Sequence, residues 1–76
     1  MQLFTRIDYN GMSIEYWAPE TFEEGYNWNI VVFRGNEFKG ERKFNQMDMK
    51  NNYVGTFEEI AVNGKSLVDL LISQGK

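Results

Sequence analysis

The sequence predicts a small α+β domain: an antiparallel sheet of four or five short strands, made from two hairpins plus one further strand, with a C-terminal helix packed on one face. Three observations predict this fold. Aromatic residues make up 16% of the chain and suit a pleated surface. Asn-Gly and Gly-Asn pairs mark tight turns between alternating segments, and a helix-capping serine precedes the last apolar run. A chain of 76 residues has room for one domain, covering 1–76.

The first predicted hairpin joins residues 2–9 to a strand that starts at Met12. Asn10-Gly11 between them is the commonest pair for a type I′ turn. With these two residues in the turn, the cross-strand pairs are Tyr9–Met12, Ile7–Ile14 and Thr5–Tyr16 on one face and Arg6–Glu15 and Phe4–Trp17 on the other. A slip of one residue would put the charged pair on the apolar face, so the pattern supports this register.

The second predicted hairpin covers residues 28–44. Pro19 ends the preceding strand, and residues 19–24, closed by Gly25, fit one helical turn. Residues 26–34 are apolar on both faces toward their middle, which is typical of a central strand. Gly35-Asn36 is the next tight turn, and residues 37–44 then return as the partner strand, with Phe38 and Phe44 predicted on one face.

The remaining residues divide into a loop, a strand and a helix. Residues 45–55 show no decisive period and are interpreted as a loop. Residues 56–62 are predicted as a strand that ends at Asn63-Gly64. Ser66 is predicted to cap a helix that ends at Gly75.

Composition argues against catalysis. The chain contains no histidine and no cysteine, so nucleophilic triads, thiolate chemistry and histidine-metal sites are excluded. We therefore expect a protein that is not an enzyme, with no catalytic residues, cofactor or metal. The absence of cysteine indicates a reducing compartment, and the longest apolar run, Ile30 to Phe33, is far below the roughly 20 residues of a membrane span. The expected location is the cytoplasm, without membrane association.

One candidate surface is a basic and aromatic stretch in the 33–44 hairpin. Its cations, Arg34, Lys39, Arg42 and Lys43, alternate with phenylalanines, a combination found in proteins that bind single-stranded nucleic acid. Glu37 and Glu41 interrupt the stretch, and the net charge of the chain is -3. Nucleic-acid binding is therefore kept as the alternative, because phosphate binders concentrate positive charge on one face.

A second candidate surface follows from the aromatic excess. One short helix covers one face of the predicted sheet, so the rings on the other face remain for a partner. Tyrosine and tryptophan are enriched where protein interfaces concentrate their binding energy. The predicted partner-binding residues are Phe4, Arg6, Glu15 and Trp17, together with the acidic Glu20, Glu23 and Glu24.

In size and composition the chain resembles the small inhibitors encoded by phages and mobile elements, anti-CRISPR proteins among them. It is short, acidic and rich in aromatic and asparagine residues. The resemblance implies a non-catalytic protein that blocks a site on a larger host protein or complex in the host cytoplasm. A nucleic-acid-binding module and a homodimeric scaffold that pairs its uncovered sheet faces stay open as alternatives.

Overall fold

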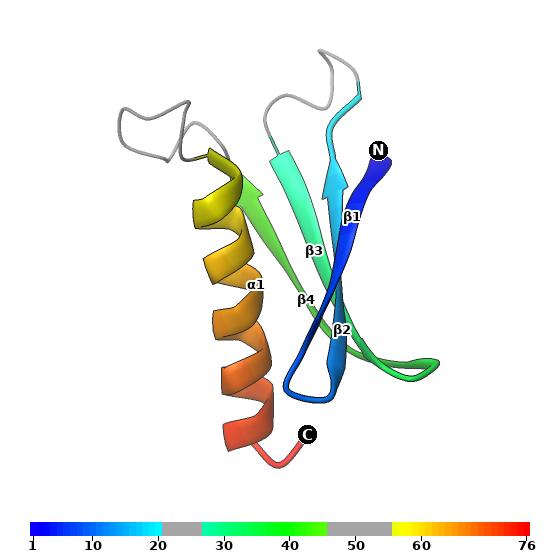
Figure 1. Ribbon diagram of the computed structural model, residues 1–76, viewed down its shortest axis with the longest axis vertical. Helices are drawn as coiled ribbons and strands as arrows, with labels where there is room; N and C mark the ends of the chain where they lie inside the picture. The colour runs from blue at the N-terminus through cyan, green and yellow to red at the C-terminus, as the bar shows by residue number, and fades with distance from the viewer. Residues whose placement is uncertain (21–26, 46–55) are drawn as a thin grey trace.

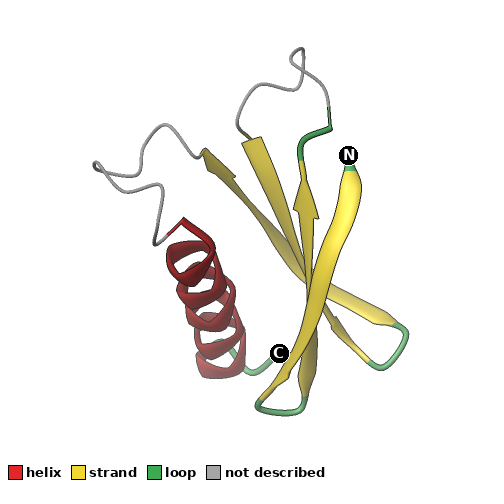
Figure 2. Ribbon diagram, turned by 45° about the horizontal axis from the view of Figure 1, so that its top comes forward, coloured by secondary structure: helices red, strands yellow, loops and turns green. Residues whose placement is uncertain are grey.

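A four-stranded antiparallel sheet and one helix make up the computed structural model, which describes residues 1–20, 27–45 and 56–76. Strands β1 (Gln2–Tyr9), β2 (Met12–Ala18), β3 (Asn27–Arg34) and β4 (Glu37–Asn45) follow one another across the sheet in chain order. Helix α1 (Thr56–Ser73) packs on one face, against β2, β3 and β4 (Figures 1 and 2). The predicted α+β class is confirmed. Most of the helical turn predicted over residues 19–24 and of the loop predicted over 45–55 lies outside the described residues.

The first hairpin has the predicted turn. Asn10 and Gly11 adopt φ values of 50° and 80°, the left-handed conformation that a type I′ turn requires at both positions. The predicted pairing holds from Tyr9–Met12 through Thr5–Tyr16. A bulge then shifts the register, so that Leu3 lies opposite Trp17. The predicted pairing of Phe4 with Trp17 is therefore wrong.

An aromatic cluster on the helix side explains this bulge. The Phe4 ring lies 4.9 Å from the ring of Phe57 in α1 and 5.4 Å from that of Trp28 in β3, measured between centroids. Regular alternation would place Phe4 on the opposite face of the sheet, away from these rings. The extra residue in β1 turns Phe4 toward the cluster, and Leu3 takes its place beside Trp17.

The core lies between the sheet and α1. Alternate residues of β2 and β3 are buried there, and four apolar residues of α1 close the core from the other side. These side chains are Met12, Ile14, Tyr16, Trp28, Ile30, Val32, Ile60, Leu67, Val68 and Leu71. The central strand predicted over residues 26–34 is confirmed, because β3 lies between β2 and β4 in the sheet.

Residues 56–62 form the first part of α1, so the strand predicted there is wrong, and Ser66 lies inside the helix instead of capping it. The helical spacing is visible in the residues of α1 that face the sheet, which are Phe57, Ile60, Ala61, Gly64, Leu67, Val68 and Leu71. Glu58 and Glu59 stand in the first turn, where negative charge stabilises a helix. Gly75 ends the helix as predicted, with φ 81° and the terminal hydrogen bonds of a glycine cap.

Gly64 lies in the middle of α1 because Tyr16 packs directly against it. The Tyr16 side chain is 0% exposed, and its hydroxyl donates a 2.9 Å hydrogen bond to the carbonyl oxygen of Ala61. A Cβ atom at position 64 would overlap the Tyr16 hydroxyl oxygen and would lie 2.8 Å from its Cζ and 2.9 Å from Cγ2 of Ile14. The Asn63-Gly64 pair therefore marks a close contact between helix and sheet.

We expect Gly64→Ala to destabilise the protein by about 1–3 kcal/mol, because overpacking and the lost hydrogen bond outweigh a gain of about 1 kcal/mol in helix propensity. Urea denaturation would measure the change. Ser66→Ala, on the exposed side of the same helix, is the matched control and should change stability by no more than roughly 0.5 kcal/mol. Equal stabilisation by both variants would contradict the close contact.

Burial raises the pKa of Tyr16 from 10.0 to about 12. The unfolded chain then loses this phenol proton near pH 10 while the folded chain keeps it, so its contribution to stability is complete below pH 10 and is lost as the pH rises toward 12. We expect the unfolding free energy of the wild type to fall more steeply between pH 10 and 12 than that of Tyr16→Phe. Chemical denaturation at several pH values would test this, and parallel profiles would contradict it.

Candidate functional site

The sheet face opposite α1, called here the open face, is the candidate site. Register places its side chains in three rows that cross the sheet from β1 to β4. These rows are Leu3–Trp17–Asn29–Lys43, Arg6–Glu15–Val31–Glu41 and Asp8–Ser13–Phe33–Phe38. On the covered face the β2 and β3 side chains are buried, whereas the open-face residues of the same strands are half-buried. In the described part of the chain, nothing packs over the open face.

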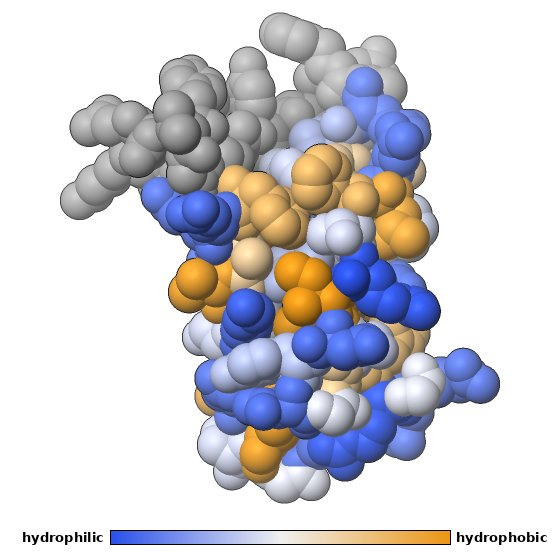
Figure 3. All heavy atoms as spheres, in the orientation of Figure 1, coloured by the Kyte–Doolittle hydropathy of each residue, from blue (hydrophilic) through white to orange (hydrophobic). Residues whose placement is uncertain are grey.

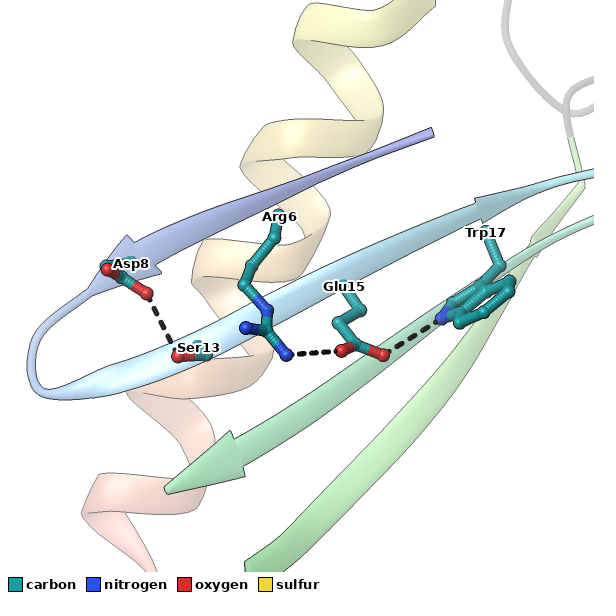
Figure 4. A network of polar contacts seen from close by, with 5 residues as sticks. All are labelled: Arg6, Asp8, Ser13, Glu15 and Trp17. Carbon is teal, nitrogen blue, oxygen red and sulfur yellow. Dashed lines mark hydrogen bonds and ion pairs between the residues drawn. The ribbon is translucent and has the colours of Figure 1, made fainter. Parts of the chain in front are cut away.

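A hydrogen-bonded network holds Trp17 in position on this face (Figure 4). The Trp17 Nε1 atom donates to Oε1 of Glu15 at 3.1 Å, and the Arg6 Nη2 atom donates to the other carboxylate oxygen at 2.7 Å. The Glu15 side chain is 14% exposed and that of Arg6 is 58% exposed. One carboxylate thus holds an indole and a guanidinium together before any partner binds. The predicted residues Arg6, Glu15 and Trp17 are brought together by the structure.

An aromatic pair at the other end of the open face was missed by the sequence analysis. Phe33 and Phe38 lie opposite each other with ring centroids 6.1 Å apart in an edge-to-face arrangement. A bulge between Phe38 and Gly40 turns Phe38 to the open face, where it is 55% exposed, while Phe44 stays on the covered face. Counting cross-strand partners outward from the Gly35-Asn36 turn would have found this pair.

Asn29 carries an unsatisfied acceptor in the same row as Trp17. Its Oδ1 atom is buried, and none of the described residues donates a hydrogen bond to it. A buried acceptor without a donor costs about 1–3 kcal/mol. Asn29 lies between Trp17 on β2 and Lys43 on β4. The open face therefore contains a polar group that no residue in the described ranges satisfies.

The four cations of the alternative nucleic-acid surface do not share one face. Arg42 lies on the covered side, where Nη1 donates to the backbone and side-chain oxygens of Asn63 at 3.3 and 3.2 Å. Lys39 forms a 3.1 Å ion pair with Glu37, and its side chain is 16% exposed. Arg34 is exposed at the end of β3, and Lys43 stands on the open face. The geometry disperses their charge.

Of the other predicted partner-binding residues, the structure describes Phe4 and Glu20. Phe4 belongs to the aromatic cluster on the helix side, although its ring remains 57% exposed. The carboxylate of Glu20 lies 3.7 Å from the amino group of Met1. Glu23 and Glu24 lie outside the described residues.

Comparison with known proteins gives no match to a family model, a curated protein or a solved structure. Among the described residues, no helix has both the length and the apolar character needed to cross a membrane. The same residues contain no group of three acidic side chains placed to hold a metal ion. The candidate site thus rests on the geometry of the open face.

We expect Glu15→Ala to free the Trp17 side chain and to lower stability by about 1–2 kcal/mol, because it removes an ion pair and a hydrogen bond at a carboxylate that is only 14% exposed. Hydrogen exchange of the Trp17 indole N–H, followed by NMR, should become faster. Arg6→Ala is the matched control, since it leaves the bond from Trp17 to Glu15 in place and should change that exchange much less. Equal exchange rates in both variants would contradict the anchoring role of Glu15.

Proposed function

We propose that this protein binds a larger protein through its open face and acts by covering that partner's surface, without catalysis. The observation that carries the proposal is the Trp17 side chain, which Glu15 holds in place beside the exposed Leu3. An aromatic side chain that is fixed before binding loses little conformational entropy in the complex. Tryptophan is also among the residues that most often dominate interface energies.

The rest of the open face has the layout of an interface. Half-buried apolar side chains, Val31 and Phe33, lie on the inner strand β3. Exposed charged side chains lie on the edge strands β1 and β4 beside the exposed apolar Leu3 and Phe38. Apolar side chains bordered by charged ones are common in protein interfaces. The partner that fits this face presents an apolar recess for Trp17 and Leu3.

Occlusion is the mode of action that the resemblance to phage and mobile-element inhibitors implies for such a binder. A rigid sheet can block a substrate or assembly site of a host protein without chemistry of its own. The dispersed cations make nucleic acid a weaker candidate, because the positive charges of Arg42 and Lys39 are engaged within the protein.

We expect Trp17→Ala to weaken partner binding at least about tenfold with little effect on the melting temperature, because the indole lies on the surface of the sheet and not in its core. The test immobilises the wild-type chain and each variant, adds bacterial lysate with and without nuclease treatment, and washes at high salt. Val62→Ala is the matched control, since Val62 is 64% exposed on the outer side of α1. Calorimetry with the purified partner would then give the two dissociation constants.

The proposal predicts one protein that the wild type and Val62→Ala capture in stoichiometric amounts and Trp17→Ala does not. Capture that is unaffected by Trp17→Ala would contradict a role for the open face. Material that disappears on nuclease treatment would shift the function to nucleic acid.

A further inference from the structure

The outer edge of β1 is an unpaired strand edge in the described structure. β1 is the first strand in the sheet order, and α1 packs mainly against β2, β3 and β4 (Figure 1). The side chains of Phe4 and Tyr9 reach α1 from β1, but the backbone edge of β1 has no neighbouring strand among the described residues. Figure 3 shows apolar side chains gathered between α1 and β1. Two apolar residues of β1 remain exposed: Leu3, on the open face, is 43% exposed, and Phe4, on the helix side, is 57% exposed. Long edge strands with exposed apolar neighbours readily pair with another strand.

The hairpin geometry shows which backbone groups of β1 point outward. In a hairpin closed by a two-residue turn, the residues that flank the turn exchange backbone hydrogen bonds, and such pairs alternate along the strands. Tyr9 and Met12 flank the turn here. Tyr9, Ile7 and Thr5 therefore bond to β2, while the N–H and C=O groups of Asp8 and Arg6 point away from the sheet.

We propose that two copies of this chain pair β1 with β1, antiparallel, around a two-fold axis at Ile7. In this register Arg6 of each copy lies opposite Asp8 of the other, and both residues present outward backbone groups for the new hydrogen bonds. Two charge pairs form on the open face, where opposite charges stabilise a sheet. The edge of β1 is thus self-complementary. Opposite charges face each other, and the residues whose backbone groups point outward lie opposite one another.

The helix side of β1 fits the same register. Ile7 meets Ile7 at the axis, and Thr5 of each copy lies opposite Tyr9 of the other. Ile7 and Tyr9 are half-buried residues packed against the core. Tyr9 is held there, because its hydroxyl donates to Oδ2 of Asp69 at 3.2 Å and its ring lies 5.8 Å from the Lys65 ammonium. Pairing would bury the remaining exposed surface of these apolar side chains.

Other registers and the other edge fit less well. An axis at Arg6 or at Asp8 would bring like charges together, and an axis at Thr5 would run into the bulge at Phe4. The register with its axis at Ile7 pairs residues 5–9 of each copy, and these residues form the part of β1 without a bulge. The opposite edge, β4, is interrupted by its own bulge at residues 38–40 and is packed against α1.

The proposal is tested by analytical ultracentrifugation of the purified protein over a range of concentrations, independently of any partner. Arg6→Asp gives a chain with carboxylates at positions 6 and 8, and Asp8→Arg gives a chain with guanidinium groups at the same two positions. Each variant alone places like charges opposite each other, so its dimer dissociation constant should rise at least about tenfold. An equimolar mixture places opposite charges together and should form a heterodimer.

Glu41→Arg is the matched control for Asp8→Arg. It makes the same change, from a carboxylate to a guanidinium, on the open face of the other edge strand, β4, and should leave the dimer intact. Circular dichroism checks that each variant folds. Arg6→Asp also removes the ion pair to Glu15, whereas Asp8 contacts Ser13, so Asp8→Arg still tests the edge if Arg6→Asp unfolds. A monomeric wild type, or a dimer that persists in Asp8→Arg, would overturn the proposal.

Discussion

The contact between Tyr16 and the middle of α1 determines the rest of the arrangement. The Tyr16 hydroxyl is buried, and its hydrogen bond to the Ala61 carbonyl requires a residue without a side chain at Gly64. A buried hydroxyl that lost this acceptor would cost about 1–3 kcal/mol, so sliding or rotation of the helix is opposed by more than apolar packing. This contact fixes which turn of α1 lies over β2. It also determines which side of the sheet is covered and which is left open.

The composition of the open face follows from that placement. With α1 in position, Phe57 lies beside Trp28 and Tyr16, and Phe4 completes the aromatic cluster. β1 reaches this packing by inserting a bulge, which brings Leu3 next to Trp17. The apolar side chain beside the anchored indole is therefore a consequence of packing on the opposite face. Edge strands accommodate such bulges because one of their sides has no partner to disturb.

Turn chemistry made both hairpins predictable, because Asn10-Gly11 and Gly35-Asn36 fix the register of the strands that they join. The Arg6–Glu15 pair and the position of Trp17 on the open face followed from that register. The first part of α1 was missed, since Asn63-Gly64 has the composition of a turn and its actual cause, a tyrosine from β2, is distant in the sequence. The bulges at Phe4 and Phe38 were missed for a related reason. Each depends on tertiary packing that local alternation does not contain.

Arg6 links the two proposed surfaces physically. Its guanidinium binds the carboxylate that anchors Trp17, and in the paired edge it would also face Asp8 of the second copy. A guanidinium held between two carboxylates has fewer conformations than one held by a single carboxylate, so pairing would stiffen the Trp17 network. A stiffer network lowers the entropy cost of binding a partner. Because linkage is reciprocal, a partner on the open face would then stabilise the dimer by the same free energy.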